Sequence, residues 1–237
     1  MAHIEDSKQN RKQPGGAMER TYLARANAKA QQTSKHAISS IDSIPPVAIF
    51  EHPDRAHQEG NKIVKTDDDD GNSLSAFNPI ISSEIVRFEG KFKNIDGGYF
   101  TIGIFDAVTF FKDEKWPDED DETMKRILIY GNNRTLIHFS EDNTIEMPEF
   151  KNDQRVAFEV NMSSTPRTLN FFIDDEQLPV QIINIPSAIR FYIGIDNEES
   201  SFTITRFERL QSSSAQEINE SKTLEWGKQW ENEKKEE

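Results

Sequence analysis

Apolar and polar side chains alternate with a period of two over most of residues 85–210, and this pattern constrains the fold more than any other feature of the sequence. Such alternation gives each segment one apolar face, as in half-buried antiparallel strands. The apolar positions of the successive segments are Val86, Phe88 and Phe92; Phe100, Ile102 and Ile104; Ile127 and Ile129; Ile137 and Phe139; Val156, Phe158 and Val160; Leu169, Phe171 and Ile173; Ile189, Phe191 and Ile193; Phe202 and Ile204. We therefore expect a series of short strands in this region.

Turn-forming residues separate these segments at close intervals. The turn signals are Asp96-Gly97-Gly98, Gly131-Asn132-Asn133, residues 163–166, Asp174-Asp175 and Asp196-Asn197. About eight to ten short strands without a helical crossover are typical of an antiparallel β-sandwich or jelly roll. The sequence predicts an all-β protein whose sandwich domain spans residues 85–210.

The chain before this domain begins with a basic arm. Fourteen of the 16 phenylalanines lie between Phe88 and Phe207, although only 35% of all residues are hydrophobic. Residues 1–40 contain seven Lys or Arg and three Asp or Glu, so this arm has a net charge of +4 in a chain of net charge −14. Within the arm, residues 17–32 lack Gly and Pro, which favours a short basic helix. We expect either a solvated arm or one that docks on a partner or on an acidic surface.

Residues 41–84 are predicted to form an irregular connector between the arm and the sandwich. The features that oppose regular structure are Pro45, Pro46, Pro53, Pro79 and the four aspartates of 67–70. Apolar islands interrupt the connector at residues 47–50, 63–64 and 77–81. These islands are expected to fasten the connector to the sandwich or to another surface.

Residues 211–237 are predicted to form a charged helical tail. Trp226 and Trp230 are four residues apart, so a helix would place both on one face, although Gly227 weakens its centre. Two tryptophans on a short charged segment favour burial. Two alternatives follow: the tail packs on its own sandwich, or the tryptophans insert into a groove of a partner.

Composition excludes several classes of protein. The chain has no cysteine, which excludes a disulfide scaffold, a Cys-ligated metal site and a thiol nucleophile. It has no apolar run of membrane-spanning length, and its first ten residues lack the apolar region of a secretory signal. The negative net charge opposes binding to nucleic acid, because affinity for phosphates comes from clustered Lys and Arg. We expect a soluble cytoplasmic protein without a membrane span.

The sequence presents no complete catalytic or metal site. His138 is the one histidine of five inside the predicted domain, and we expect a surface or half-buried structural side chain because no Gly-x-Ser-x-Gly motif accompanies it. Residues 66–77 resemble a calcium-binding loop in part, but Phe77 stands where a bidentate Glu is required. Glu84 and Glu89 have the wrong spacing for the paired carboxylates of a retaining glycosidase. We expect a non-enzyme with no metal, no cofactor and no small-molecule substrate.

The segments of the predicted sandwich occur in an informative order. They are residues 98–104 with an Ile-Gly step, a hairpin of 129–131 and 135–139, residues 153–162, residues 167–174 with Thr-Leu-Asn-Phe-Phe-Ile-Asp, and two closing strands at 185–195 and 200–207. This order resembles the SPRY (B30.2-like) domain, particularly the divergent forms that are numerous in protists. The resemblance implies a jelly-roll sandwich that serves as a non-catalytic protein-interaction module and recognises its partners through strand-connecting loops.

We therefore expect a binding module or adaptor whose contacts lie in loops and flanking segments, and whose partner is a protein. The candidate partner-binding residues are Trp116 and Asp118 in an acidic loop, Arg134 after the central turn, Arg167 after Pro166, and Trp226 and Trp230 in the tail. One alternative is a structural component of a large cytoskeletal or ciliary, microtubule-associated assembly, held by the N-terminal arm. A second alternative is a lectin-like domain that binds carbohydrate.

Overall fold

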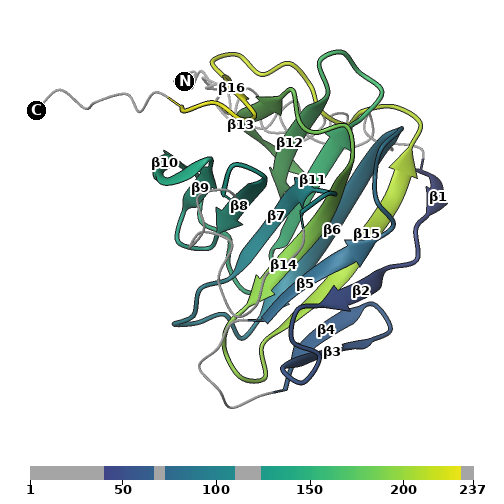
Figure 1. The fold of residues 1–237 in the computed structure, drawn as a ribbon, viewed down its shortest axis with the longest axis vertical. Helices are drawn as coiled ribbons and strands as arrows, with labels where there is room; N and C mark the ends of the chain where they lie inside the picture. The colour runs from purple at the N-terminus through teal and green to yellow at the C-terminus, as the bar shows by residue number, and fades with distance from the viewer. Residues whose placement is uncertain (1–39, 67–72, 110–123, 231–237) are drawn as a thin grey trace, which may run out of the picture. The chain divides into compact units, whose positions relative to one another are not determined.

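The computed structural model describes residues 40–66, 73–109 and 124–230 of the chain. They all belong to one of the chain's two units, Ile38–Glu237. In these described residues, sixteen β-strands form two sheets (Figure 1). The prediction of an all-β sandwich is confirmed. The basic helix expected at residues 17–32 lies outside the described residues.

The larger sheet has nine strands in the described part of the chain. Eight follow one another in the order β16-β13-β12-β11-β6-β15-β4-β3, and β1 pairs with β15. Their bounds are β1 (Ser40–Ser43), β3 (Ala56–Glu59), β4 (Lys62–Lys65), β6 (Ile85–Lys93), β11 (Arg155–Asn161), β12 (Thr168–Ile173), β13 (Glu176–Ile183), β15 (Ser201–Leu210) and β16 (Lys222–Glu225). Neighbouring strands are antiparallel except for β13 and β16, which are parallel.

The smaller sheet has seven described strands, all paired antiparallel, in the order β10-β9-β8-β7-β14-β5-β2. Their bounds are β2 (Val47–Phe50), β5 (Ser73–Asn78), β7 (Thr101–Asp106), β8 (Ile127–Gly131), β9 (Thr135–His138), β10 (Ser140–Glu146) and β14 (Ile189–Ile195). Connections between the two sheets, such as β6 to β7 and β14 to β15, place loops at the ends of the sandwich.

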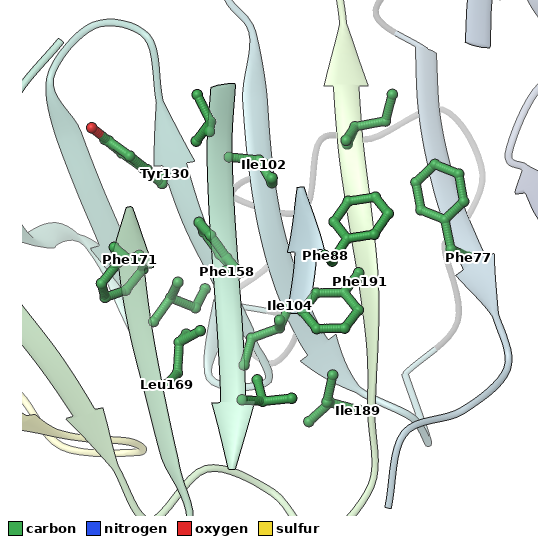
Figure 2. Close-up of a cluster of buried hydrophobic side chains, with 14 of the residues drawn as sticks. Phe77, Phe88, Ile102, Ile104, Tyr130, Phe158, Leu169, Phe171, Ile189 and Phe191 are labelled. Atoms are coloured by element: carbon green, nitrogen blue, oxygen red, sulfur yellow. The ribbon is translucent and has the colours of Figure 1, made fainter. Parts of the chain in front are cut away.

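Aromatic rings from both sheets meet in the core. Phe88 of β6 in the larger sheet stacks on Phe191 of β14 in the smaller sheet, with ring centroids 5.0 Å apart and an interplanar angle of 14°. The ring centroid of Phe77 in β5 also lies 5.0 Å from that of Phe88. Both side chains are labelled in Figure 2. A second group of rings includes Tyr130, which meets Phe171 edge-on at 6.2 Å. The apolar positions expected in β6, β7, β11, β12, β14 and β15 therefore face the opposite sheet.

In β8 and β9 the expected face is wrong: Ile127, Ile129 and Ile137 pack in a separate cluster on the other side of the smaller sheet. Their alternate neighbours Leu128, Tyr130 and Leu136 join the main core instead, because both faces of these strands are apolar.

The prediction of an irregular connector is wrong for the described part of residues 41–84. Strands β1 to β5 all lie within residues 40–78. Strand β2 pairs with β5, and β5 pairs with β14, so the apolar islands at 47–50 and 77–81 extend the smaller sheet. The island at 63–64 lies in β4, which pairs with β15 in the larger sheet. The four prolines lie between strands, where a missing N–H removes no hydrogen bond of the sheet. Pairing with distant strands overrides a local sequence that disfavours regular structure.

The predicted helical tail is also wrong in its described part, residues 211–230. This segment contains one strand, β16, which runs parallel to β13 with Leu224 beside Ile182. Gly227 follows with a φ of 73°, a left-handed value that turns the chain after the strand. A helix of this length has little stability alone, whereas the open edge of β13 supplies hydrogen-bonding groups to an extended segment.

Substitution of Phe88 tests the packing of the two sheets. Phe88→Ala should lower the free energy of unfolding by about 3–5 kcal/mol, because it removes a fully buried ring that contacts both Phe77 and Phe191 and leaves a cavity. Denaturant titration of the full chain measures this loss. The matched control is Phe50→Ala, which removes a half-buried ring and should cost clearly less. Equal losses in the two variants would contradict the central position of Phe88.

Candidate interaction surface

Strand register brings four loops to one end of the sandwich. In the larger sheet, Lys93 at the end of β6 lies opposite Ser201 at the start of β15, and β11 also begins beside the end of β6. In the smaller sheet, Thr101 at the start of β7 lies opposite Gly131 at the end of β8. The loops that share this end are 94–100, 131–134, 151–154 and 196–200. We call it the asparagine-braced end.

Asparagine side chains tie the first of these loops to the other three. Asn152 Oδ1 accepts a hydrogen bond from the Ile95 N–H, and Asn152 Nδ2 donates one to the Asp96 carboxylate, both at 3.2 Å. Asn132 accepts a hydrogen bond from the Phe100 N–H at 3.1 Å and donates one to the Gly98 carbonyl at 3.0 Å. Asn197 donates to a carbonyl of the same loop at 2.9 Å. Because these bonds fix the loops relative to one another, a partner would bind with a smaller loss of loop entropy.

The bracing asparagines were not among the residues that the sequence singled out. Asn132 and Asn197 were expected only as turn residues. The available signal was the recurrence of Asn at turns. Which turns share an end depends on the order and register of strands far apart in the chain, so this signal alone does not locate a surface.

Arg134 lies at the asparagine-braced end, in the turn between β8 and β9. It has a φ of 70°, and its side chain is 57% exposed. Its Nη2 lies 2.6 Å from Glu146 Oε1. An exposed ion pair of this kind contributes about 0–1 kcal/mol, so a partner could replace it at small cost. A role for Arg134 in partner binding stays a prediction.

Arg167 lies at the opposite end, because β12 begins beside the last residues of β11 and β13. Its Nε donates to the Ile185 carbonyl at 2.9 Å and to the Pro186 carbonyl at 3.2 Å. The half-buried side chain thus holds the turn between β13 and β14. The structure does not bring Arg134 and Arg167 together on one surface.

The other two candidate loop residues, Trp116 and Asp118, lie outside the described residues. The nearest strand residues on either side are Asp106 of β7 and Ile127 of β8. Both are at the same end as Arg167, since Asp106 pairs with the first residue of β14 and Ile127 with the neighbour of Asp106. Participation of Trp116 and Asp118 in binding stays a prediction.

Residues 211–230, which we call the C-terminal strap, are fastened first to the larger sheet. Glu159 of β11 is 1% exposed, and its carboxylate accepts hydrogen bonds from Ser213 Oγ at 2.6 Å, from the Ser214 N–H at 2.8 Å and from Ser214 Oγ. Gln177 then exchanges two hydrogen bonds with the backbone of Gln216, at 2.7 and 3.1 Å. Strand β16 continues this attachment along the edge of β13.

The second half of the strap reaches the smaller sheet. The backbone N–H of Trp226 still donates to the Ile183 carbonyl of β13, in the larger sheet, at 3.0 Å. The backbone N–H of Trp230 donates to Asn143 Oδ1 of β10, in the smaller sheet, at 2.6 Å. Trp230 is only 5% exposed, while Trp226 is half-buried with its ring 4.2 Å from that of His138. Of the two alternatives for the tail, the structure shows packing on its own sandwich. A contact between Trp226 or Trp230 and a partner stays a prediction.

His138 receives the strap at the smaller sheet. The ring is fully buried rather than half-buried as expected, with Nδ1 2.6 Å from the Ile127 carbonyl and Nε2 2.7 Å from the Gly227 N–H. These contacts require a neutral ring that donates from Nδ1 and accepts at Nε2. Burial lowers the pKa of His138 to about 4. A ring whose two nitrogens both bond the backbone acts as a structural side chain, as the sequence predicted.

Within the described ranges, no group of three or more His, Asp or Glu side chains is placed to bind a metal ion. The same part of the chain includes no helix with the length and apolar character of a membrane span.

No protein-family model matches the sequence, and no curated protein matches it. Solved structures do match. A crystal structure of a human SPRY domain is similar with a TM-score of 0.51 and 10% sequence identity, over 70% of this chain and 99% of that one. The chain has the SPRY fold. The SPRY domain of human HERC1 is similar with a TM-score of 0.48 and 11% identity, over 70% of this chain and 100% of that one.

Other matches share the sandwich architecture. The TRIM65 PSpry domain matches with a TM-score of 0.48 and 9% identity, over 77% of this chain and 99% of that one. The carbohydrate recognition domain of Emp47p matches with a TM-score of 0.46 and 11% identity, over 73% of this chain and 93% of that one. At 10% identity the likeness to the human SPRY domain is one of fold alone, and it confirms the fold that the resemblance to SPRY domains implied.

The contacts of His138 predict a loss of stability at acidic pH. The pKa of about 4 in the folded protein is below the ordinary value of 6.5, so the neutral ring stabilises the fold above pH 6.5, and this contribution is lost as the pH falls toward 4. A shift of this size corresponds to about 3 kcal/mol. We expect His138→Gln to be less stable at pH 7 and to show a flatter pH dependence between pH 6.5 and 4. Denaturant titration monitored by tryptophan fluorescence measures both effects.

The control for this prediction is His52→Gln, which removes a half-buried histidine between β2 and β3. It should retain the pH dependence of the unsubstituted protein. If His138→Gln instead kept the full dependence on pH, the buried ring would not be the group that couples protonation to unfolding.

Proposed function

We propose that this chain is a non-catalytic protein-interaction module that binds a partner protein through loops of the SPRY fold. The observation that carries the proposal is the asparagine-braced end, where side chains of three loops hold a fourth loop in place. Loops that a rigid scaffold positions are frequent sites of binding. The braced loops meet that description, because their geometry is fixed before a partner arrives.

The chemistry of this end suits a polar protein interface. Exposed residues of its loops include Asp96, Asn133, Arg134, Lys151 and Asp153, which offer charges of both signs and an amide. Such a mixture discriminates between partners mainly through electrostatic complementarity, which affects specificity and the rate of association. Guanidinium groups are over-represented among residues that dominate binding energy, which makes Arg134 the first residue to test.

Arg134→Glu should weaken binding of the partner about tenfold or more, because it removes the guanidinium and reverses its charge at the asparagine-braced end. Tagged full-length protein is first used to isolate partners, which are identified by mass spectrometry, and affinities are then measured for each variant. The matched control is Arg126→Glu, which reverses an exposed charge at the other end of the sandwich, beside β8.

The opposite result is informative. If Trp116→Ala and Arg126→Glu released the partner while Arg134→Glu did not, the binding loops would lie at the Arg167 end and the asparagine-braced end would be the wrong choice. Retention of every partner by all three variants would contradict binding through loops at either end.

The alternative role, as a structural component held by the N-terminal arm, is tested by deleting the arm without removing any described strand. Removing residues 1–80 would delete strands β1 to β5 and so damage the sandwich itself. Removing residues 1–39 leaves all sixteen described strands in place. The interaction module that we propose should keep its partner after this shorter deletion, whereas a component held by its arm should lose its place in the assembly.

A further inference from the structure

A row of polar side chains crosses the outer face of the larger sheet, which is the face turned away from the smaller sheet. Residues in register on neighbouring strands form this row, and their Cβ atoms are typically about 4.5–5.5 Å apart. From β15 to β16 the row consists of Glu208, Arg87, Glu159, Asn170, Gln181 and Thr223. We call it the polar row.

The first half of the polar row is closed by the protein itself. Arg87 is 2% exposed, lies 4.4 Å from the centroid of the Phe172 ring and is paired with Glu89 at 2.9 Å. Glu159 is covered by Ser213 and Ser214 of the C-terminal strap, which donate hydrogen bonds to its carboxylate. The charges in this half are therefore compensated, and it offers no binding site.

The second half of the row opens into a cleft of about 640 Å³ between the β12–β13 face and the C-terminal strap. The side chains on its sheet wall include Asn161, Thr168, Asn170 and Gln181, and residues 215–221 of the strap line it continuously. We call it the amide cleft.

Asn170 and Gln181 present polar groups on the floor of the amide cleft. Asn170 is 2% exposed, and its Oδ1 accepts a hydrogen bond from Gln181 Nε2 at 3.1 Å. The Asn170 Nδ2 donates to no described residue, and Gln181 Oε1 accepts from none. Neither atom is enclosed by the protein, so both are accessible from the cleft. The floor thus presents a hydrogen-bond donor beside an acceptor.

We propose that the amide cleft binds an extended, uncharged or basic polar segment of a partner protein, with an amide group of that segment bonded to Asn170 and Gln181. An amide carries both a carbonyl acceptor and an N–H donor, which matches the pair on the floor. The proposal rests on the proposed function as an interaction module, but it uses a surface separate from the asparagine-braced end.

The lining of the cleft disfavours other ligands. Its charged residues are Glu217 and Glu220, and the described lining contains no Lys or Arg, so phosphate and carboxylate groups would meet no cation. It contains no aromatic residue either, so a sugar ring would find no flat apolar face on which to stack. An extended peptide could contact the seven consecutive strap residues of one wall and the strands of the other at the same time.

Selection from a displayed library of random twelve-residue peptides tests the proposal on the full chain. Selected peptides are synthesised with a fluorescent label, and their dissociation constants are measured by anisotropy. We expect neutral or basic peptides rich in Asn, Gln, Ser and Thr. Asn170→Ala, which removes the donor, should weaken them about tenfold. Asn133→Ala, an exposed amide at the asparagine-braced end, is the matched control and should change nothing.

Thr223→Trp provides a second variant that does not depend on a buried position. Thr223 is exposed on β16 and lines the amide cleft, so a large ring there should block peptide binding without disturbing the core. The proposal is overturned if no peptide is selected, if the selected peptides are acidic, or if Asn170→Ala and Thr223→Trp bind them unchanged. Retention of a saccharide on a glycan array, lost in Thr223→Trp, would assign the cleft to carbohydrate and overturn the peptide class.

Failure of the amide-cleft proposal can be distinguished from failure of the proposed function by comparing two variants. A partner that is lost with Arg134→Glu and kept with Thr223→Trp supports loop binding and overturns peptide binding in the amide cleft by that partner. The reverse pattern supports the amide cleft and contradicts binding at the asparagine-braced end.

Discussion

Packing of the two sheets through Phe88 and Phe191 is the interaction on which the other features depend. The contact fixes which face of each strand is buried, because a shift of one residue in a strand would turn its apolar side chains to the solvent. Once the register is fixed, the strand ends are fixed as well, and the loops at each end acquire definite neighbours. The asparagine-braced end exists because the ends of β6, β8 and β14 and the starts of β7, β11 and β15 coincide. The positions of the loops are therefore consequences of core packing rather than of loop sequence.

The sequence predicts eight of the ten strands from β6 to β15, because alternation is a local property that needs no knowledge of the partner strand. It misses β10 and β13, where no alternating apolar segment was recognised. Strands β1 to β5 were missed, since short apolar islands such as residues 47–50 become strands only when β5 and β14 are available to pair with them. In the tail, the local sequence predicted a helix where the structure has an extended segment. Trp226 and Trp230 have a spacing that suits a helix, but hydrogen bonds from the edge of β13, from His138 and from Asn143 hold the segment extended. Local pattern fails wherever the deciding contact is distant in sequence.

The candidate sites also divide into features that the local sequence predicts and features that depend on contacts distant in sequence. Arg134 and Arg167 could be recognised as loop residues, but their positions at opposite ends depend on register. Asn170 was not singled out from the sequence, and nothing near it in the sequence indicates that it is buried. Its burial and the cleft beside it result from the C-terminal strap, which crosses the same face some forty residues later in the chain. A residue of this kind is found by locating a largely buried side chain that keeps one polar atom open to a cleft and unpaired with any described residue.

The C-terminal strap links these features energetically. Glu159 could not remain buried without the hydroxyl and backbone donors of Ser213 and Ser214, since an unpaired buried carboxylate is costly. The strap is thus required by the composition of the sheet beneath it, and it is fastened again at His138, near its other end. The amide cleft lies between these two attachments. A ligand there would contact both the sheet and the strap, so its binding free energy would add to the stability of the strap. Protonation of His138 would remove the acceptor for the Gly227 N–H, so the strap would lose one of its contacts with the smaller sheet at acidic pH.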